Sequence, residues 1–332
     1  MKYTLLKLLY FLLYFIGIFK LFYFLNRHKQ IVITYHNIIP DAIYDNDLVH
    51  LGVSCSENIF IKQINIIAAR FDMSTEVGIP GTCIISFDDG YKNNIEIAAK
   101  ILSKNNIDGL FFIPACYYES LDALWVDQLL MWVSYCPVGC YLILDQEFLI
   151  AQNCATRNAL WEFLYQTLLS NYCLLKPLIN ELNNHYSFDQ LRALINNEMF
   201  ALRFTPMSSD EIELLKKGGH KIGCHSYKHD ILSLLTDEQL EHDFLICKSY
   251  SKKYNSNYYS YPFGGIDEIS QKVIEKCKEN HYSAAFLNYE NKNKDIYSLG
   301  RVSLGNKSNK YCIEAQLCGF ENMLKKIMKS AV

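Results

Sequence analysis

Short apolar runs of strand-forming residues alternate with segments of helical periodicity along most of this 332-residue chain. Segments 59–71, 94–103, 210–217 and 237–250 show the 3.6-residue apolar period of amphipathic helices. The alternation favours parallel strands joined by helical crossovers, so we predict an α/β fold with a parallel sheet, open or closed into a barrel. The predicted strands are 31–35, 83–87, 109–113, 221–224, 258–261, 283–287 and 297–302.

Two of the predicted helices carry a start signal. Ser208 with Glu211, and Thr236 with Gln239, fit the capping box, in which the two side chains satisfy free N–H groups of the first turn. The segment 121–205 breaks the alternation, because its pattern is mostly helical and it holds all three tryptophans. We interpret it as an insertion between two strands, forming a helical subdomain or lid.

The composition excludes two classes of protein. Hydrophobic residues make up 50% of the chain and charged residues 20%, which excludes intrinsic disorder as the main state. A net charge of −3 argues against a partner that is a nucleic acid. The 12 cysteines include no C-x-x-C pair, and reduced, buried thiols are favoured over disulfides. The sequence leaves the oligomeric state open.

The N-terminus is almost wholly apolar as far as residue 25. About 20 helical residues span a bilayer, so we predict a membrane anchor in 1–29, with a single-pass signal-anchor helix at about 5–25 and a catalytic domain over 30–332. A cleaved signal peptide and an interfacial helix are the alternatives. The side of the membrane stays open, because basic residues flank both ends of the apolar run.

Ser86-Phe87-Asp88-Asp89-Gly90 stands where an apolar strand is expected to end. Adjacent carboxylates are costly to bury without partners, and neighbours in a strand point to opposite faces. Both can reach one site only where the strand breaks, which Gly90 permits. A simple turn or helix cap is the alternative interpretation.

His225 and His229 follow the predicted strand 221–224. Histidines four residues apart can present two imidazoles to one metal ion. With one aspartate of the Asp88-Asp89 pair they would form a two-histidine, one-carboxylate set, as used for catalytic Zn²⁺ or Fe²⁺. The other aspartate would stay free as a general base.

The order of three motifs carries a family resemblance. Asp-Asp-Gly, then the two histidines, then Tyr261-Pro262-Phe263-Gly264-Gly265 resembles the polysaccharide deacetylases of the NodB-homology type, carbohydrate esterase family 4. Segments 214–226 and 34–36 look like the corresponding parts of that family. The resemblance covers about 31–304 without the insertion.

The resemblance implies a distorted (β/α) barrel with its site at the C-terminal ends of the strands. It also implies a divalent metal, Zn²⁺ foremost, with Co²⁺ or Ni²⁺ also compatible. It assigns the following roles: catalytic base, Asp88; metal ligands, Asp89, His225 and His229; backbone donor of an oxyanion hole, Phe263; residues shaping the turn, Pro262 and Gly264.

Two family features are missing. Many members carry an arginine just ahead of the third motif, where this chain has Ser260-Tyr261, and Arg301 is a candidate substitute. The late Leu-x-His that supplies the general acid is also absent, and His36 is a candidate on position alone. The general acid therefore stays unassigned.

These features predict a membrane-anchored, metal-dependent hydrolase that removes N-acetyl groups from an amino-sugar-containing polysaccharide or lipid-linked glycan. An O-acetyl or formyl esterase on the same fold is one alternative, since esters depend less on a general acid. A non-catalytic glycan-binding relative is the other, because two family residues are missing. The sequence does not choose the glycan.

Overall fold

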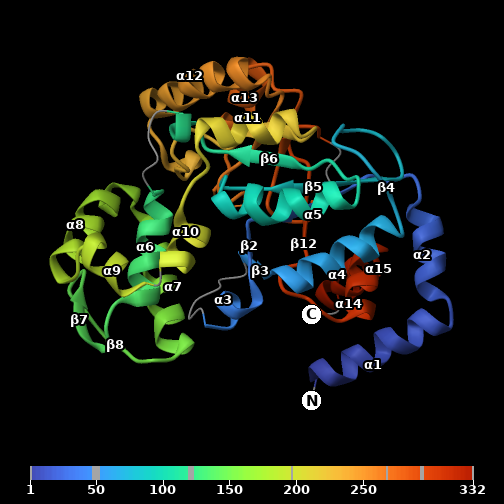
Figure 1. Ribbon diagram of the computed structural model, residues 1–332, viewed down its shortest axis with the longest axis horizontal. Helices are drawn as coiled ribbons and strands as arrows, with labels where there is room; N and C mark the ends of the chain where they lie inside the picture. The colour runs from blue at the N-terminus through green and yellow to red at the C-terminus, as the bar shows by residue number, and fades with distance from the viewer. Residues whose placement is uncertain are drawn as a thin grey trace.

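The computed structural model describes residues 2–46, 53–118, 123–195, 197–266, 268–291 and 295–330. Its centre is a parallel sheet in the order β11-β10-β9-β6-β5-β1-β12, with β4 (Asp72–Met73) beside β5 (Figure 1). The strands are β1 (Ile31–Tyr35), β5 (Thr82–Phe87), β6 (Leu110–Ile113), β9 (Lys221–Cys224), β10 (Tyr258–Ser260), β11 (Ala284–Phe286) and β12 (Val302–Ser303). The predicted strands are confirmed except at 297–302, where only Val302 is in a strand.

The sheet curls, so that its two edges approach each other. A parallel bridge joins Phe286 of β11 to Leu299, which precedes β12, and the Leu287 amide donates to the Leu299 carbonyl at 2.9 Å. The sheet is therefore a distorted half-barrel, as expected, and the carboxyl ends of its parallel strands face one side. Segment 297–301 closes the edge with isolated bonds, which explains why it does not form a regular strand.

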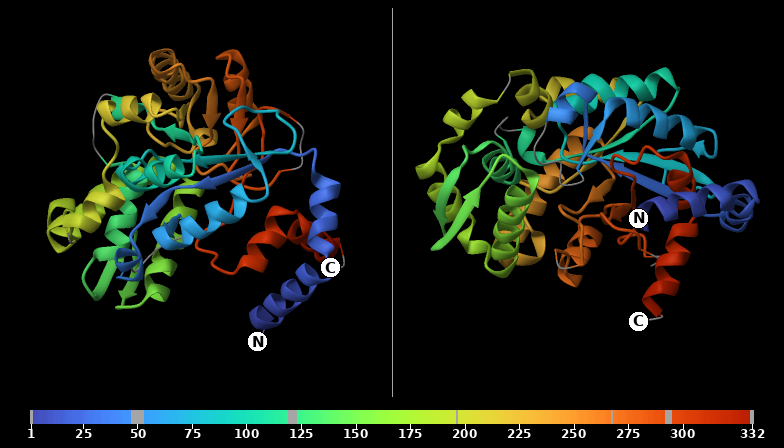
Figure 2. Two further views of the ribbon diagram at one scale, coloured as in Figure 1. Left: turned by 45° about the vertical axis from the view of Figure 1, so that its right-hand side comes forward. Right: turned by 90° about the horizontal axis from the view of Figure 1, so that it is seen from below.

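Helices cover the outer face of the sheet (Figures 1 and 2). Both predicted capping boxes are present, at Ser208 and Thr236. The covering elements and the C-terminal helices are α4 (Glu57–Ala68), the π-helix η1 (Asn94–Ala99), α5 (Lys100–Lys104), α11 (Ser209–Lys217), α12 (Asp237–Tyr254), α13 (Gln271–Glu279), α14 (Lys310–Leu317) and α15 (Phe320–Ser330). The small elements outside the sheet are β2 (Asn37–Ile39), α3 (Asp41–Asn46), β3 (Ser54–Ser56), η2 (Ala115–Tyr118) and η4 (Leu232–Leu234).

The insertion between β6 and β9 has a core of its own, centred on the fully buried Trp132. Residues 121 and 122, at its predicted start, lie outside the described residues. It is mostly helical as predicted, but it also contains an antiparallel hairpin that the sequence analysis missed. Its elements are α6 (Trp125–Tyr135), β7 (Gly139–Ile143), β8 (Gln146–Ile150), α7 (Cys154–Ser170), η3 (Tyr172–Leu174), α8 (Leu175–His185), α9 (Phe188–Leu194) and α10 (Asn197–Phe204).

The N-terminus forms two helices, α1 (Lys2–Phe15) and α2 (Ile18–Asn26), where one continuous helix was predicted. Gly17 adopts φ 85°, a left-handed conformation that ends α1, and the pair is bent by 74°. No single helix among the described residues is long and apolar enough to cross a bilayer, and only the bent pair together meets that criterion. The predicted single-pass helix at about 5–25 is therefore not supported.

Candidate metal and catalytic site

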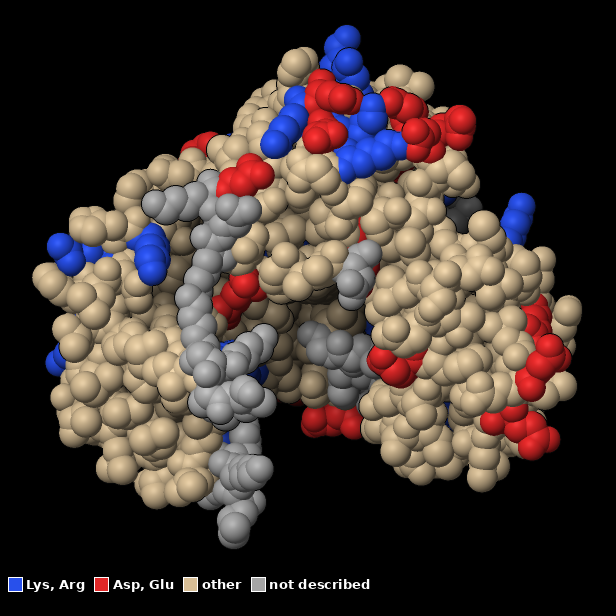
Figure 3. Space-filling view, turned by 180° about the vertical axis from the view of Figure 1, so that it is seen from behind, with Lys and Arg blue, Asp and Glu red and all other residues tan. Residues whose placement is uncertain are grey.

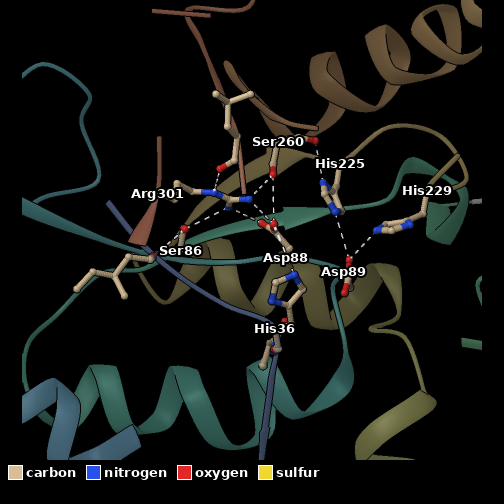
Figure 4. Close-up of polar contacts among 11 residues, drawn as sticks. His36, Ser86, Asp88, Asp89, His225, His229, Ser260 and Arg301 are labelled. Carbon is tan, nitrogen blue, oxygen red and sulfur yellow. Dashed lines mark hydrogen bonds and ion pairs between the residues drawn. The ribbon is translucent and has the colours of Figure 1, made fainter. Parts of the chain in front are cut away.

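The candidate residues meet at the carboxyl side of the half-barrel (Figure 4). Asp88 and Asp89 follow β5, His225 and His229 follow β9, and His36 follows β1. Parallel strands bring their carboxyl ends to one edge, so residues almost 140 positions apart become neighbours. Arg301 does not follow a strand: it precedes β12, and its long side chain extends to Asp88.

Asp89, His225 and His229 form a buried cluster that could hold a metal ion, since their nearest ligand atoms lie within 4.8 Å of one another. Asp89 Oδ1 lies 3.2 Å from His225 Nε2 and 3.2 Å from His229 Nε2. Ligand bonds of 2.0–2.2 Å at a tetrahedral centre place neighbouring ligand atoms about 3.3–3.6 Å apart. The spacing therefore suits a small divalent cation.

The hydrogen bonding of this cluster also fits a cation. His225 Nδ1 lies 2.7 Å from the Ser260 carbonyl oxygen, which fixes the proton on Nδ1 and leaves a lone pair on Nε2. That lone pair faces Asp89 Oδ1, a buried atom without a hydrogen-bond partner among the described residues. Facing lone pairs need a proton or a cation between them. The donor set of two imidazoles and one carboxylate leaves positions open for substrate and water.

Asp88 is held by Arg301 in a bidentate ion pair. The two guanidinium nitrogens donate to Asp88 Oδ1 and Oδ2 at 2.7 and 2.5 Å, and both side chains are almost fully buried. Arg301 also donates to the Leu287 carbonyl at 2.7 Å and to Ser260 Oγ at 2.9 Å. Burial alone would raise the pKa of Asp88, but the Arg301 charge outweighs it and lowers that pKa.

His36 points toward Asp88, with Nε2 at 3.9 Å from Asp88 Oδ2 (Figure 4). Burial lowers the pKa of His36 although both Asp88 and Asp89 act in the opposite direction. The imidazole is therefore neutral near pH 7 in this structure. Burial also acts to raise the pKa of Asp89, but contacts with His225 and His229 hold it well below its ordinary value.

Left-handed backbone conformations concentrate at this site. Asp89, Ser226, His229 and Phe263 have φ between 57° and 69°, which non-glycine residues rarely adopt. Asp89 is the second residue after β5, and its backbone turn sends its side chain to the two histidines while Asp88 faces Arg301. Such strain persists where the surroundings impose it, and it concentrates at functional sites.

The third motif forms a turn beside His229. The Phe263 ring packs on the His229 ring at 4.8 Å between centroids, and the Phe263 amide makes no hydrogen bond to another described residue. Gly264 has φ 63°, and a Cβ there would lie 2.5 Å from the Asn288 amide nitrogen. Gly264 therefore occupies a position where a side chain would not fit, and the Phe263 N–H has no hydrogen-bond partner among the described residues.

The insertion contacts the candidate site, which fits the lid rather than the separate subdomain among the two interpretations of the sequence, although no contacting residue was named. The Trp125 indole N–H donates to the His229 carbonyl at 3.0 Å, and the Trp125 and Tyr165 rings both pack on Phe263. Ser260 was also missed, although it bonds both Asp88 and Arg301. The only sequence signal for Trp125 was its position at the start of the insertion.

The curled parallel sheet thus carries a buried carboxylate–imidazole cluster beside a second carboxylate, a donor set that metal-dependent hydrolases use. Residues 178–282 match the family model described as polysaccharide deacetylase. This segment contains both histidines and the third motif, and it begins after the aspartate pair.

Two solved structures show the same fold. The deacetylase PplD of Streptococcus pyogenes, in complex with acetate, has a TM-score of 0.53 and 12% identity over 86% of this chain and 97% of that one. IcaB from Ammonifex degensii has a TM-score of 0.52 and 15% identity over 88% of this chain and 97% of that one. A search of the curated proteins finds no match. The resemblance predicted from the sequence is confirmed: the polysaccharide deacetylase model matches residues 178–282, and two solved deacetylase-type structures share the fold.

Proposed function

We propose that this chain is a metal-dependent deacetylase that removes N-acetyl groups from an amino-sugar-containing glycan, either a polysaccharide or a lipid-linked one. The observation that carries the proposal is the buried Asp89–His225–His229 cluster beside an aspartate that Arg301 keeps ionised. The cluster supplies three metal ligands, and the carboxylate of Asp88 lies outside it. Of the two adjacent aspartates, Asp89 therefore serves as a metal ligand and Asp88 as the base.

Each group then has one task in amide hydrolysis. A divalent ion held by Asp89, His225 and His229 would supply Lewis-acid polarisation of the acetyl carbonyl and lower the pKa of water. Asp88 accepts the proton from the attacking water, and Arg301 orients the carboxylate and keeps it charged. The Phe263 N–H donates to the oxygen that becomes negative in the transition state.

The direct test is acetate release from N-acetylglucosamine oligomers and polymers by the purified full chain, combined with metal analysis of the same sample. Release that depends on Zn²⁺, Co²⁺ or Ni²⁺ supports the proposal. Release from O-acetylated glycans alone would favour the esterase alternative. Metal binding and glycan binding without turnover on either substrate would identify a non-catalytic relative.

His229→Ala is expected to lower bound metal well below one ion per chain, because it leaves only Asp89 and His225 as protein ligands. His242→Ala is the matched control, since His242 is exposed on α12 and outside the cluster. The measurement is metal content after dialysis, with circular dichroism to verify the fold. A wild-type chain that binds none of Zn²⁺, Co²⁺ and Ni²⁺ would contradict the assignment of the three metal ligands.

His36→Gln tests the protonation of the leaving amine. His36 Nε2 lies 3.9 Å from Asp88 Oδ2, beyond direct hydrogen-bond distance, so it would receive a proton through a bridging water and deliver it to the amine. General acids contribute about 10²–10⁴-fold to C–N cleavage. We expect a loss of kcat of that size on the amide and a small loss on the corresponding acetate ester. Equal losses on both substrates would show that His36 only maintains the geometry of Asp88.

A further inference from the structure

The helix α1 exposes one continuous apolar stripe. Its residues recur at the spacing of a single helix face, and each is 39–69% exposed. The stripe, with the residue that follows α1, consists of Leu5, Leu8, Leu9, Phe11, Leu12, Phe15 and Ile16. On α2, Leu21, Phe24 and Leu25 are exposed as well. Exposed apolar areas of this extent mark interaction surfaces rather than ordinary solvent-facing helices.

The opposite faces of both helices are fixed to the folded domain. Tyr10 and Phe19 are 2% and 1% exposed, and they pack against Phe320 and neighbouring residues of α14 and α15. Asn26 donates to the Cys318 carbonyl at 2.8 Å, and the Tyr23 hydroxyl donates to Glu314 at 2.7 Å. Straightening the pair into one span would break this packing and these hydrogen bonds.

A basic cavity adjoins the apolar stripe. It has a volume of about 370 Å³, and its lining includes the exposed Lys20, Arg27 and Lys29. Arg70 also lines it, but its charge is paired with the buried Glu314 at 2.7 Å. Residues 1–40 contain five Lys and Arg and no acidic residue, although the whole chain has a net charge of −3. The side of the molecule with α1 and α2, at the right of Figure 1, lies at the left of Figure 3. There it forms a broad area without charged side chains, with basic side chains at its margin. The N-terminal 40 residues, which carry the apolar stripe, therefore also carry an excess of positive charge.

We propose that α1 and α2 lie in the plane of an anionic bilayer, with the apolar stripe at the acyl boundary and lipid phosphates at the basic cavity. An apolar helix face flanked by Lys and Arg is the pattern of helices that lie in a membrane interface. A second copy of the chain is a poorer occupant, because two such basic lobes would repel each other. This attachment does not rest on the proposed deacetylation.

The test is flotation of the purified full chain with vesicles of phosphatidylcholine alone or mixed with phosphatidylglycerol. The wild type is expected to bind the anionic vesicles more tightly and to lose that advantage at high salt. The triple variant Lys20→Glu, Arg27→Glu, Lys29→Glu should bind them at least roughly 100-fold more weakly. Its control is Lys217→Glu, Lys248→Glu, Lys252→Glu, which changes exposed lysines elsewhere and should bind like the wild type.

The stripe variant Leu8→Ser, Leu12→Ser, Phe15→Ser should lose binding to both vesicle types. Its control is Leu142→Ser, Leu149→Ser, at positions 54% and 70% exposed on the β7–β8 hairpin. No binding by the wild type, or equal binding by stripe and control variants, would overturn the proposal. Dimerisation that the stripe variant abolishes, without vesicle binding, would identify a second copy as the occupant. Resistance of membrane-bound chain to carbonate extraction would indicate a span instead of in-plane attachment.

Discussion

Replacing Asp88 by Asn is expected to lower kcat by roughly 10²–10⁴ while the metal content stays unchanged. Asparagine keeps the shape of the side chain but cannot accept a proton from water. Asp88 lies outside the ligand cluster, so its loss leaves all three protein ligands in place. The measurement is acetate release at saturating substrate together with metal analysis of the same preparation.

The neighbouring substitution is the matched control. Asp89→Asn weakens a ligand, so metal and activity should be lost together. Metal lost with Asp88→Asn and kept with Asp89→Asn would mean that the two aspartates exchange roles. Full activity in both variants would show that the carboxylate pair is only a turn, and the proposed deacetylation would fail with it.

Arg301→Met is expected to destabilise the fold by about 3–5 kcal/mol, because it leaves the Asp88 charge buried without its partner. Methionine fills much of the arginine volume, so the loss reports on charge more than on packing. Urea unfolding followed by circular dichroism gives the free energy of unfolding. Arg301→Lys keeps the charge but not the bidentate geometry, and should fall between the wild type and Arg301→Met.

The double variant Asp88→Asn, Arg301→Met separates the ion pair from other roles of Arg301. If pairing carries most of the effect, the double variant should be more stable than Arg301→Met alone, because the uncompensated carboxylate is gone. If the double variant instead loses, relative to the wild type, the sum of the two single losses, the effect belongs to the bonds that Arg301 makes to Leu287 and Ser260.

The ends of the strands made much of the site predictable. Asp88, Asp89, His225 and His229 each follow a short apolar run, and parallel strands necessarily bring such positions together. The strand pattern left open which aspartate joins the histidines, and only the family resemblance assigned Asp89, because the choice depends on the left-handed turn at that residue. A non-glycine residue in that conformation has no sequence signal, since its surroundings impose it.

Features that depend on long-range packing could not be predicted. The sequence analysis named Arg301 as a candidate substitute for the missing arginine on position alone, and the curl of the sheet is what brings it within 2.7 Å of Asp88. The apolar N-terminus matched the composition of a membrane span, yet Gly17 breaks it and α14 and α15 provide an alternative surface for Tyr10 and Phe19. Hydropathy counts apolar residues but does not specify what they pack against.

The position of Arg301 beside β12 has a consequence for inactivation by heat. β12 is a two-residue strand at the edge of the sheet, and strands of this kind open by sub-global fluctuations at lower cost than central strands. Each opening would withdraw the guanidinium from Asp88 while β5 and β9 stay folded. The proposed base would then lose the charge that keeps it ionised before the fold melts, so the temperature of half-inactivation would lie below the melting temperature.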